Sequence, residues 1–158
     1  RIATEFILWD LYDYATNSGR KDVPLPIVLD EIQNLDHRLD APLGKFLTEG
    51  RKFGLSLILA TQTLSNLKAD ERDRLFQASH KLFFKPAETE VKEYARILEQ
   101  GSNEKTETWI ARLNKLNKGD CYSLGPALNP GSDELENKIF KIHISSLTDR
   151  FKKDNSND

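Results

Sequence analysis

The stretch PLPIVLDE, residues 24–31, decides the fold. Its aliphatic part, Ile27–Leu29, is short and continuous, and prolines stand only at its leading edge. Such a run is typical of a strand buried in a parallel sheet. A second run of the same kind, LSLILA at residues 55–60, comes next after an intervening helical pattern. The two runs therefore predict consecutive parallel strands joined by a helix.

Helical periodicity and turn residues predict the elements around these strands. Helices are expected at residues 1–17, 40–53, 86–101 and 106–117, and further strands at residues 81–85, 121–124 and 138–144. Asp40 is the expected cap of the second helix, with Pro42 in its first turn. Residues 125–133 are expected to form a loop, and the polar tail 152–158 to be disordered. This alternation indicates one α/β domain over residues 1–151, with a mostly parallel sheet flanked by helices.

The first predicted helix has a broad apolar face. Ile2, Phe6 and Trp9 recur with helical spacing, and Ile7 and Ala15 widen the stripe that they form. A stripe of this width is expected to pack against the rest of the domain. We therefore predict that Ile2, Phe6 and Trp9 point inward.

The composition excludes several classes of protein. The 158 residues include 23 basic and 25 acidic side chains, so charge alone predicts no non-specific nucleic-acid binding. An apolar fraction of 38% excludes wholesale disorder, and no apolar run reaches the ~18 residues of a membrane helix. The single cysteine, Cys121, allows no internal disulfide and suggests a reducing, cytoplasmic location. Because the chain starts at Arg1 and contains no methionine, we expect a piece of a longer polypeptide.

An acidic pair, Asp30 and Glu31, directly follows the first strand. In open α/β sheets, ligands bind at the carboxyl ends of the strands. There one carboxylate can hold Mg²⁺ through water, and the second can polarise a water for attack on a phosphoryl group. The alternative is an ordinary solvated start of a loop.

A hydroxyl and an amide, Thr61 and Gln62, end the second strand at the same predicted edge. A neutral amide there can hydrogen-bond a γ-phosphate or the attacking water, and so report which nucleotide is bound. The alternative is that the pair simply caps the following turn. Arg51, in the last turn of the preceding helix, either complements the helix dipole or reaches a phosphate in its own or a neighbouring subunit.

The order of these motifs resembles the HerA/FtsK superfamily of P-loop ATPases, especially its HerA and VirB4 branches. In that family an apolar strand ends in the Walker B Asp-Glu pair, and a segment like EGRKFGLSLILATQ, residues 49–62, follows. The match covers residues 26–62, with Asp30, Glu31, Arg51 and Gln62 at the family's functional positions. The pattern is also similar to the C-terminal ATPase region of the large restriction protein of DNA-phosphorothioation systems.

The resemblance implies a partial RecA-like fold that binds ATP and Mg²⁺ and drives a DNA translocase or helicase. Asp30 would hold the metal ion through water, and Glu31 would activate the attacking water. Gln62 would sense the γ-phosphate, with Thr61 also near the nucleotide, and Arg51 would contact a phosphate or an interface. DNA and a homo-oligomeric ring, typically a hexamer, are the implied partners.

The sequence departs from the family at the phosphate loop. No stretch fits the Walker A pattern G-x-x-x-x-G-K-[ST], which seats the β- and γ-phosphates. We expect that loop upstream in a longer parent, and we expect the 158 residues alone to be inactive. One alternative is a non-catalytic interaction module of the same fold that recruits a nuclease or another partner. Another alternative is an unrelated α/β domain whose motifs match by chance. A structure in which the strands before Asp30 and Gln62 are not adjacent would establish it.

Other polar and aromatic residues give weaker signals. His37, His80 and His143 lie far apart and predict no zinc site. Cys121 and Trp109 are expected to be buried. Lys81 and Lys85 are expected at the ends of a strand. Arg72 and Arg74 are expected on a solvated helix face or at a subunit interface.

Overall fold

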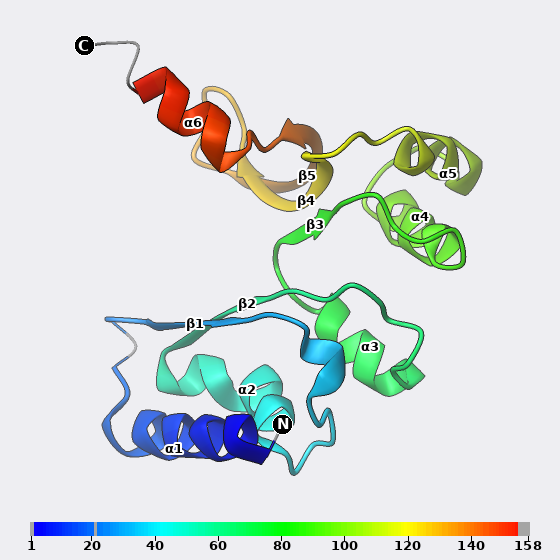
Figure 1. Ribbon diagram of the computed structural model, residues 1–158. Coiled ribbons are helices and arrows are strands. Elements are labelled where there is room, and N and C mark those ends of the chain that lie inside the picture. The colour runs from blue at the N-terminus through cyan, green and yellow to red at the C-terminus, as the bar shows by residue number, and fades with distance from the viewer. Residues whose placement is uncertain (1, 21, 155–158) are drawn as a thin grey trace. The chain divides into compact units, whose positions relative to one another are not determined.

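The computed structural model describes residues 2–20 and 22–154, and Figure 1 shows its helices and strands. It confirms an α/β chain. Contacts between residues divide the chain into two compact units, with the boundary between Gln77 and Ala78. The division falls inside the region predicted as one domain, and each unit is described by itself. No helix in the described ranges has the length and apolar character needed to cross a membrane.

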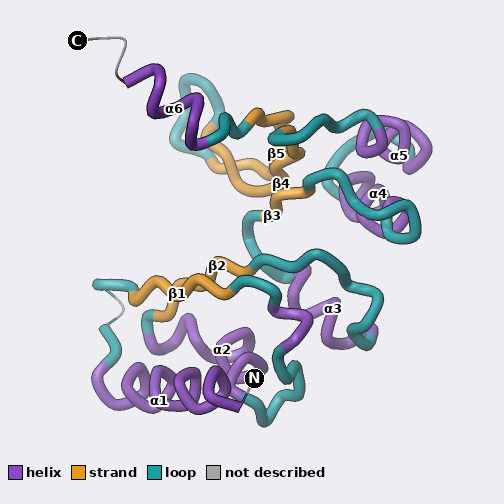
Figure 2. The backbone as a smooth tube through the Cα atoms, viewed as in Figure 1, coloured by secondary structure: helices purple, strands orange, loops and turns teal. Residues whose placement is uncertain are grey.

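The first unit is a parallel pair of strands with helices against it. Its elements are α1 (Ile2–Ser18), β1 (Leu25–Leu29), a 3-10 helix (Ile32–Asn34), α2 (Pro42–Glu49), a second 3-10 helix (Gly50–Phe53), β2 (Leu55–Leu59) and α3 (Ala69–Phe76). β1 and β2 run side by side, with Leu25 opposite Leu55 and Leu29 opposite Leu59 (Figure 2). The predicted consecutive parallel strands are therefore confirmed, and they are direct neighbours.

One face of this pair forms the core of the first unit. The cluster joins α1, α2 and both strands through five buried residues: Leu8, Ala15, Ile27, Phe46 and Leu55. Tyr12 adds an aromatic contact to Phe46 and a hydrogen bond from its hydroxyl to Oε2 of Glu49, at 3.0 Å. Burial of these apolar side chains stabilises the unit and fixes α1 against the strands.

The opposite face of the pair is exposed, which corrects the prediction of fully buried strands. Val28 and Ile58 lie opposite each other in the register and are 68% and 60% exposed. Alternate residues of each strand point to opposite sides of a sheet. Among the described residues, α1 and α2 form the core with the side of the pair that carries Ile27 and Leu55.

The inward face of α1 also differs from the prediction. Leu8 and Ala15 are buried, whereas Ile2, Phe6 and Trp9 are 75%, 66% and 40% exposed. The helix is apolar around much of its circumference, so hydrophobic spacing alone did not identify the buried side.

The ends of α2 follow the prediction in part. Pro42 occupies the first turn as expected, but Ala41 and not Asp40 is the N-cap residue. Arg51 and Lys52 lie in the 3-10 helix that follows α2. Gly54 ends that helix in the left-handed conformation, with φ of 75°, as predicted.

The second unit contains an antiparallel sheet and two packed helices. Its elements are β3 (Lys81–Phe83), α4 (Val91–Gln100), α5 (Thr106–Asn114), β4 (Asp120–Leu128), β5 (Leu135–His143) and α6 (Leu147–Asp154). The strand order is β3-β4-β5. Ala95, Leu98, Trp109 and Leu113 of the two helices form a core with Phe83 and Leu124 of the sheet.

These pairings correct three predictions. The sheet is not mostly parallel, because β4 pairs antiparallel with both β3 and β5. Residues 125–128, expected in a loop, extend β4, and the β4–β5 connection turns at Gly131, whose φ is 83°. Residues 152–154, expected to be disordered, belong to α6, whereas 155–158 lie outside the described residues.

Candidate functional site

Polar residues gather where β1 and β2 end together. Backbone hydrogen bonds continue the pairing past both strands, from Ala60 N to Leu29 O at 2.9 Å and from Ile32 N to Ala60 O at 3.1 Å. The chain segments that carry the acidic pair and Gln62 are thereby held next to each other. The separated strands that would have established an unrelated α/β domain are therefore not observed.

The carboxylate of Glu31 is the centre of this cluster. Gln62 Nε2 donates to Glu31 Oε1 at 3.1 Å, and Asn34 Nδ2 donates to Glu31 Oε2 at 3.4 Å. Each carboxylate oxygen therefore accepts a neutral amide N–H. All three residues are exposed, so the carboxylate is oriented by the protein and still open to a ligand.

The backbone of Glu31 is left-handed. With φ of 52° and ψ of 42°, it is the one non-glycine residue with positive φ among those that the structure describes. The conformation costs an L-residue about 1 kcal/mol or more. Asp30 Oδ1 accepts the Glu31 N–H at 2.8 Å and helps to hold this turn. Such strain at a strand end is frequent at functional sites.

Thr61 shapes the loop that carries Gln62. Its Oγ1 lies 2.7 Å from Gln33 Oε1 and 2.8 Å from the carbonyl oxygen of Thr63. Because a hydroxyl has one proton to donate, the two acceptors compete for it. The structure thus gives Thr61 a part in positioning Gln62, in addition to the predicted place near a nucleotide.

Sequence reasoning missed Gln33 and Asn34. Both belong to the 3-10 helix directly after the acidic pair, which places one amide against Thr61 and the other against Glu31. The available signal was two consecutive side-chain amides within three residues of Glu31.

The oxygen donors of the cluster suit a water-bridged Mg²⁺ ion. In the part of the chain that the structure describes, His, Cys, Asp and Glu side chains form no group of three or more around a possible metal ion. Mg²⁺ in proteins keeps several waters and uses one or two carboxylates together with substrate phosphates. Asp30 and Glu31 therefore fit a magnesium–phosphate site better than a cage made of protein ligands alone.

Arg51 is not brought to this cluster within the chain. It is exposed and precedes β2, whereas Gln62 follows the strand. At a rise of about 3.3 Å per residue, five strand residues separate the two ends by about 17 Å. A phosphate contact from Arg51 thus requires a ligand or subunit at the other end of the pair.

Arg74 and His37 are joined inside the first unit. Arg74 Nη2 donates to the carbonyl oxygen of His37 at 2.8 Å, and Nη1 donates to Asp70 at 3.0 Å. His37 is 4% exposed, and its Nε2 lies 2.8 Å from the carbonyl oxygen of Ile32. Arg74 therefore anchors α3 to the loop after the acidic pair.

A second polar group ties β4 to β5. Asp120 accepts from Nδ1 of His143 at 2.8 Å and pairs with Nζ of Lys141 at 3.0 Å. The His143 hydrogen bond, followed by that of Lys141, lowers the pKa of Asp120 to about 2. Next to it, Cys121 is buried as predicted, and burial raises the pKa of its thiol.

No protein-family model and no curated protein matches this sequence.

Proposed function

We propose that this chain supplies the Walker B and sensor half of an ATP-hydrolysing site of the HerA/FtsK type. The observation that carries the proposal is the contact between Gln62 Nε2 and Glu31 Oε1, at 3.1 Å. It joins the two motifs of the resemblance at the carboxyl ends of neighbouring parallel strands, the edge where α/β proteins bind ligands.

Each residue of the cluster has a role that follows from its chemistry. Bound Mg²⁺ would neutralise charge on the phosphates of ATP. Asp30 would hold the waters of that ion, and Glu31 would accept a proton from the attacking water. Gln62 orients the Glu31 carboxylate and offers the γ-phosphate a neutral hydrogen-bond donor.

The complete machine would have a RecA-like fold and a homo-oligomeric ring, typically a hexamer, that moves on or processes DNA. The parallel pair of β1 and β2, with helices packed on one face, supports this fold proposal for a two-stranded part of the sheet. In such a ring Arg51, which lies away from the acidic pair of its own chain, would act at a neighbour's interface. A nuclease partner, a role in DNA restriction and a cytoplasmic location belong to the same proposal.

A phosphate-binding loop must come from outside these 158 residues, because their sequence contains none. Without backbone N–H groups and a lysine to seat the β- and γ-phosphates, the cluster lacks most of its affinity for ATP. The proposal therefore expects no turnover by the chain alone.

The experiment compares the complete encoded polypeptide that contains this chain with the 158 residues alone. The complete polypeptide should bind Mg-ATP and hydrolyse it, and Glu31→Gln should keep binding but reduce turnover by about 10²-fold or more. Glu88→Gln, at an exposed glutamate of the second unit, is the matched control. Absence of Mg-ATP binding by the complete Glu31→Gln polypeptide would refute the ATPase proposal. Turnover by the 158 residues alone, abolished by Glu31→Gln, would refute the need for a loop from elsewhere.

The second candidate is a non-catalytic module of the same fold that recruits a nuclease or another protein. The observation that favours it is the missing phosphate-loop sequence. It predicts that the complete polypeptide binds no Mg-ATP, whereas its partner still co-purifies with the Glu31→Gln variant.

A further inference from the structure

Helix α1 has a second apolar face that the described residues of the first unit leave exposed. Ile2, Phe6 and Trp9 follow one line of the helix at i, i+4 and i+7, and are 75%, 66% and 40% exposed. Scattered exposed apolar residues are normal in proteins, but a contiguous line of large ones marks an interaction site. Leu8 and Ala15, on another side of the helix, already anchor α1 to its own core.

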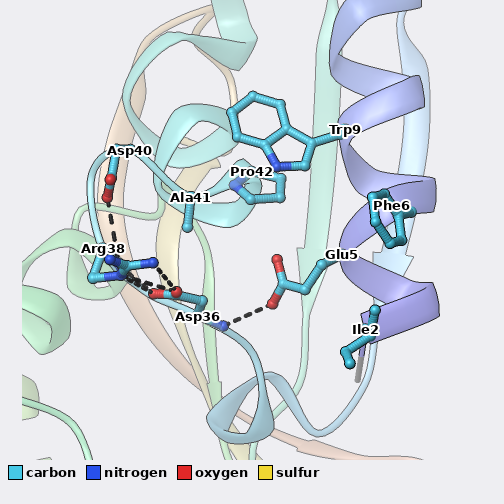
Figure 3. A pocket seen from close by; sticks show the side chains of 9 residues that line it. All are labelled: Ile2, Glu5, Phe6, Trp9, Asp36, Arg38, Asp40, Ala41 and Pro42. Atoms are coloured by element: carbon cyan, nitrogen blue, oxygen red, sulfur yellow. Dashed lines mark hydrogen bonds and ion pairs between the residues drawn. The ribbon is translucent and has the colours of Figure 1, made fainter.

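The exposed line borders a groove of about 370 Å³. Figure 3 shows α1 on one side and the segment that leads into α2 on the other, with Trp9 beside Pro42. Ala41 and Pro42 line the groove opposite α1 but are buried. Most of the exposed apolar surface at the groove therefore belongs to Ile2, Phe6 and Trp9. No residue of the Glu31–Gln62 cluster lines the groove.

The charges at the rim are mainly acidic. Glu5, Asp36 and Asp40 line the groove together with a single base, Arg38. The Arg38 guanidinium already pairs with Asp36 at 2.8 Å and with Asp40 at 4.0 Å. Figure 3 also shows Glu5, which accepts the Asp36 N–H through Oε1 at 3.0 Å.

The rest of α1 strengthens this negative field. Asp10 and Asp13 are exposed on the helix, and residues 2–18 include no lysine or arginine. A partner with positive charges beside its apolar side chains is therefore attracted, whereas an acidic partner is repelled.

We propose that α1 and residues 36–42 form a docking groove for an amphipathic helix of another protein, with lysine or arginine flanking its apolar stripe. A helix fits because its side-chain ridges pack between those at Ile2, Phe6 and Trp9, as in helix-in-groove recognition. A second copy of α1 is a poor occupant, because the carboxylates of Glu5, Asp10 and Asp13 on the two copies would repel each other. The groove goes beyond the proposed hydrolysis of ATP and does not depend on it.

The test uses the 158-residue chain and two synthetic helical peptides with the same leucine stripe. Lysine occupies the polar positions of one peptide, and glutamate those of the other. The indole N–H signals of Trp9 and Trp109 are followed by ¹H–¹⁵N NMR during each titration. Trp109 is 2% exposed and lies in the second unit, so it is an internal control.

The lysine peptide should shift the Trp9 signal to saturation and leave that of Trp109 in place. Phe6→Ala should weaken binding by about tenfold or more, as truncation of an interface anchor does. Ile7→Ala is the matched control, because Ile7 is 59% exposed on the same helix but does not line the groove. Glu5→Gln, which can still accept the Asp36 N–H, should weaken binding and reduce its dependence on salt.

Four outcomes would overturn the proposal. The first is the absence of a shift in the Trp9 signal at about 1 mM lysine peptide, and the second is binding of the glutamate peptide as tight as that of the lysine peptide. The third is an equal loss of affinity for the lysine peptide in Ile7→Ala and Phe6→Ala. The fourth is self-association of the chain that Phe6→Ala abolishes. The last would identify a second copy as the occupant. Because none of these measurements uses ATP, failure here is distinct from failure of the ATPase proposal.

Discussion

The side-chain amide of Gln62 is hydrogen-bonded to the carboxylate of Glu31, although 31 positions separate the two residues in the sequence. The parallel pairing of β1 and β2 brings them together, since each residue follows one of the two strands. A neutral donor holds the carboxylate in one orientation and adds no charge to it. In the proposed function, this contact links the residue that would activate water with the residue that would sense a bound phosphate.

Replacement of Gln62 by alanine should separate catalysis from stability. The residue is exposed, so the free energy of unfolding should change by no more than about 0.5 kcal/mol. In the complete polypeptide, ATP hydrolysis should fall by about 10²-fold while ATP binding remains, because an oriented donor is lost. Gln100→Ala, at an exposed glutamine ending α4, is the control. Unchanged hydrolysis in Gln62→Ala would contradict the sensor role.

The left-handed backbone of Glu31 predicts an unusual preference for glycine. Glu31→Gly and Glu31→Ala both remove the carboxylate and its hydrogen bonds, but only alanine keeps a Cβ that opposes φ of 52°. The glycine variant should therefore be more stable by about 1 kcal/mol, measured by urea unfolding of the 158-residue chain. Equal stability of the two variants would show that the backbone relaxes without cost.

The contacts of Asp120 predict a dependence of stability on acid. Its pKa is about 2 in the folded chain against an ordinary 3.8, mainly through His143 and then Lys141. A lowered pKa means that the ionised form stabilises the fold above about pH 4, and that this contribution disappears as the pH falls through about 2. Asp120→Asn should therefore be less stable than the unmodified chain near neutral pH, and the difference should shrink below about pH 4. Asp133→Asn, in the exposed β4–β5 turn, is the matched control.

Gly44 in α2 should not tolerate a methyl group. Alanine normally favours a helix by about 1 kcal/mol over glycine. Here a Cβ at position 44 would collide with the backbone carbonyl of Arg38. Overpacking of this kind costs about 1–3 kcal/mol, so Gly44→Ala should lower the melting temperature. A higher melting temperature would mean that residues 36–42 move away easily.

The buried thiol of Cys121 should resist alkylation. Burial, and secondarily the charge of Asp120, raises its pKa and keeps it in the unreactive thiol form. Reaction with iodoacetamide, followed by mass spectrometry, should be slower by about 10²-fold or more in the folded chain than in urea. Rapid labelling of the folded chain would show that β4 opens locally.

The sequence predicted that Asp30, Glu31 and Gln62 lie at one edge of the sheet, because the signals for this arrangement are local. Two apolar runs, each followed at once by polar residues, are sufficient to place Asp30, Glu31 and Gln62 at one edge. Gln33 and Asn34 were missed because their contacts depend on the left-handed turn at Glu31. The residue types at this turn do not predict a left-handed backbone. Glutamate there is contrary to the usual preference for glycine or asparagine.

The predictions that failed concern the buried side of α1, the extent of β4 and the presence of α6. In α1, apolar residues occupy so much of the circumference that spacing did not favour Leu8 over Phe6 as the inward residue. In β4, Gly125 and Pro126 are typical of a loop, yet both lie in a strand paired with β5. Tertiary packing determines both the buried side of α1 and the extent of β4. Helix α6 is short and charged, so it has too few apolar residues to be found by periodicity.

The bare side of the β1–β2 pair also governs how the purified chain behaves at high concentration. Val28 and Ile58 face outward together, and neither strand contains a charged residue. The other outward positions of the pair hold Pro26 and Ser56, which carry no charge, and exposed apolar surface of this kind is an aggregation liability. Solubility should therefore be limited at this patch, and a single outward charge, as in Ile58→Lys, is the smallest change that should raise it.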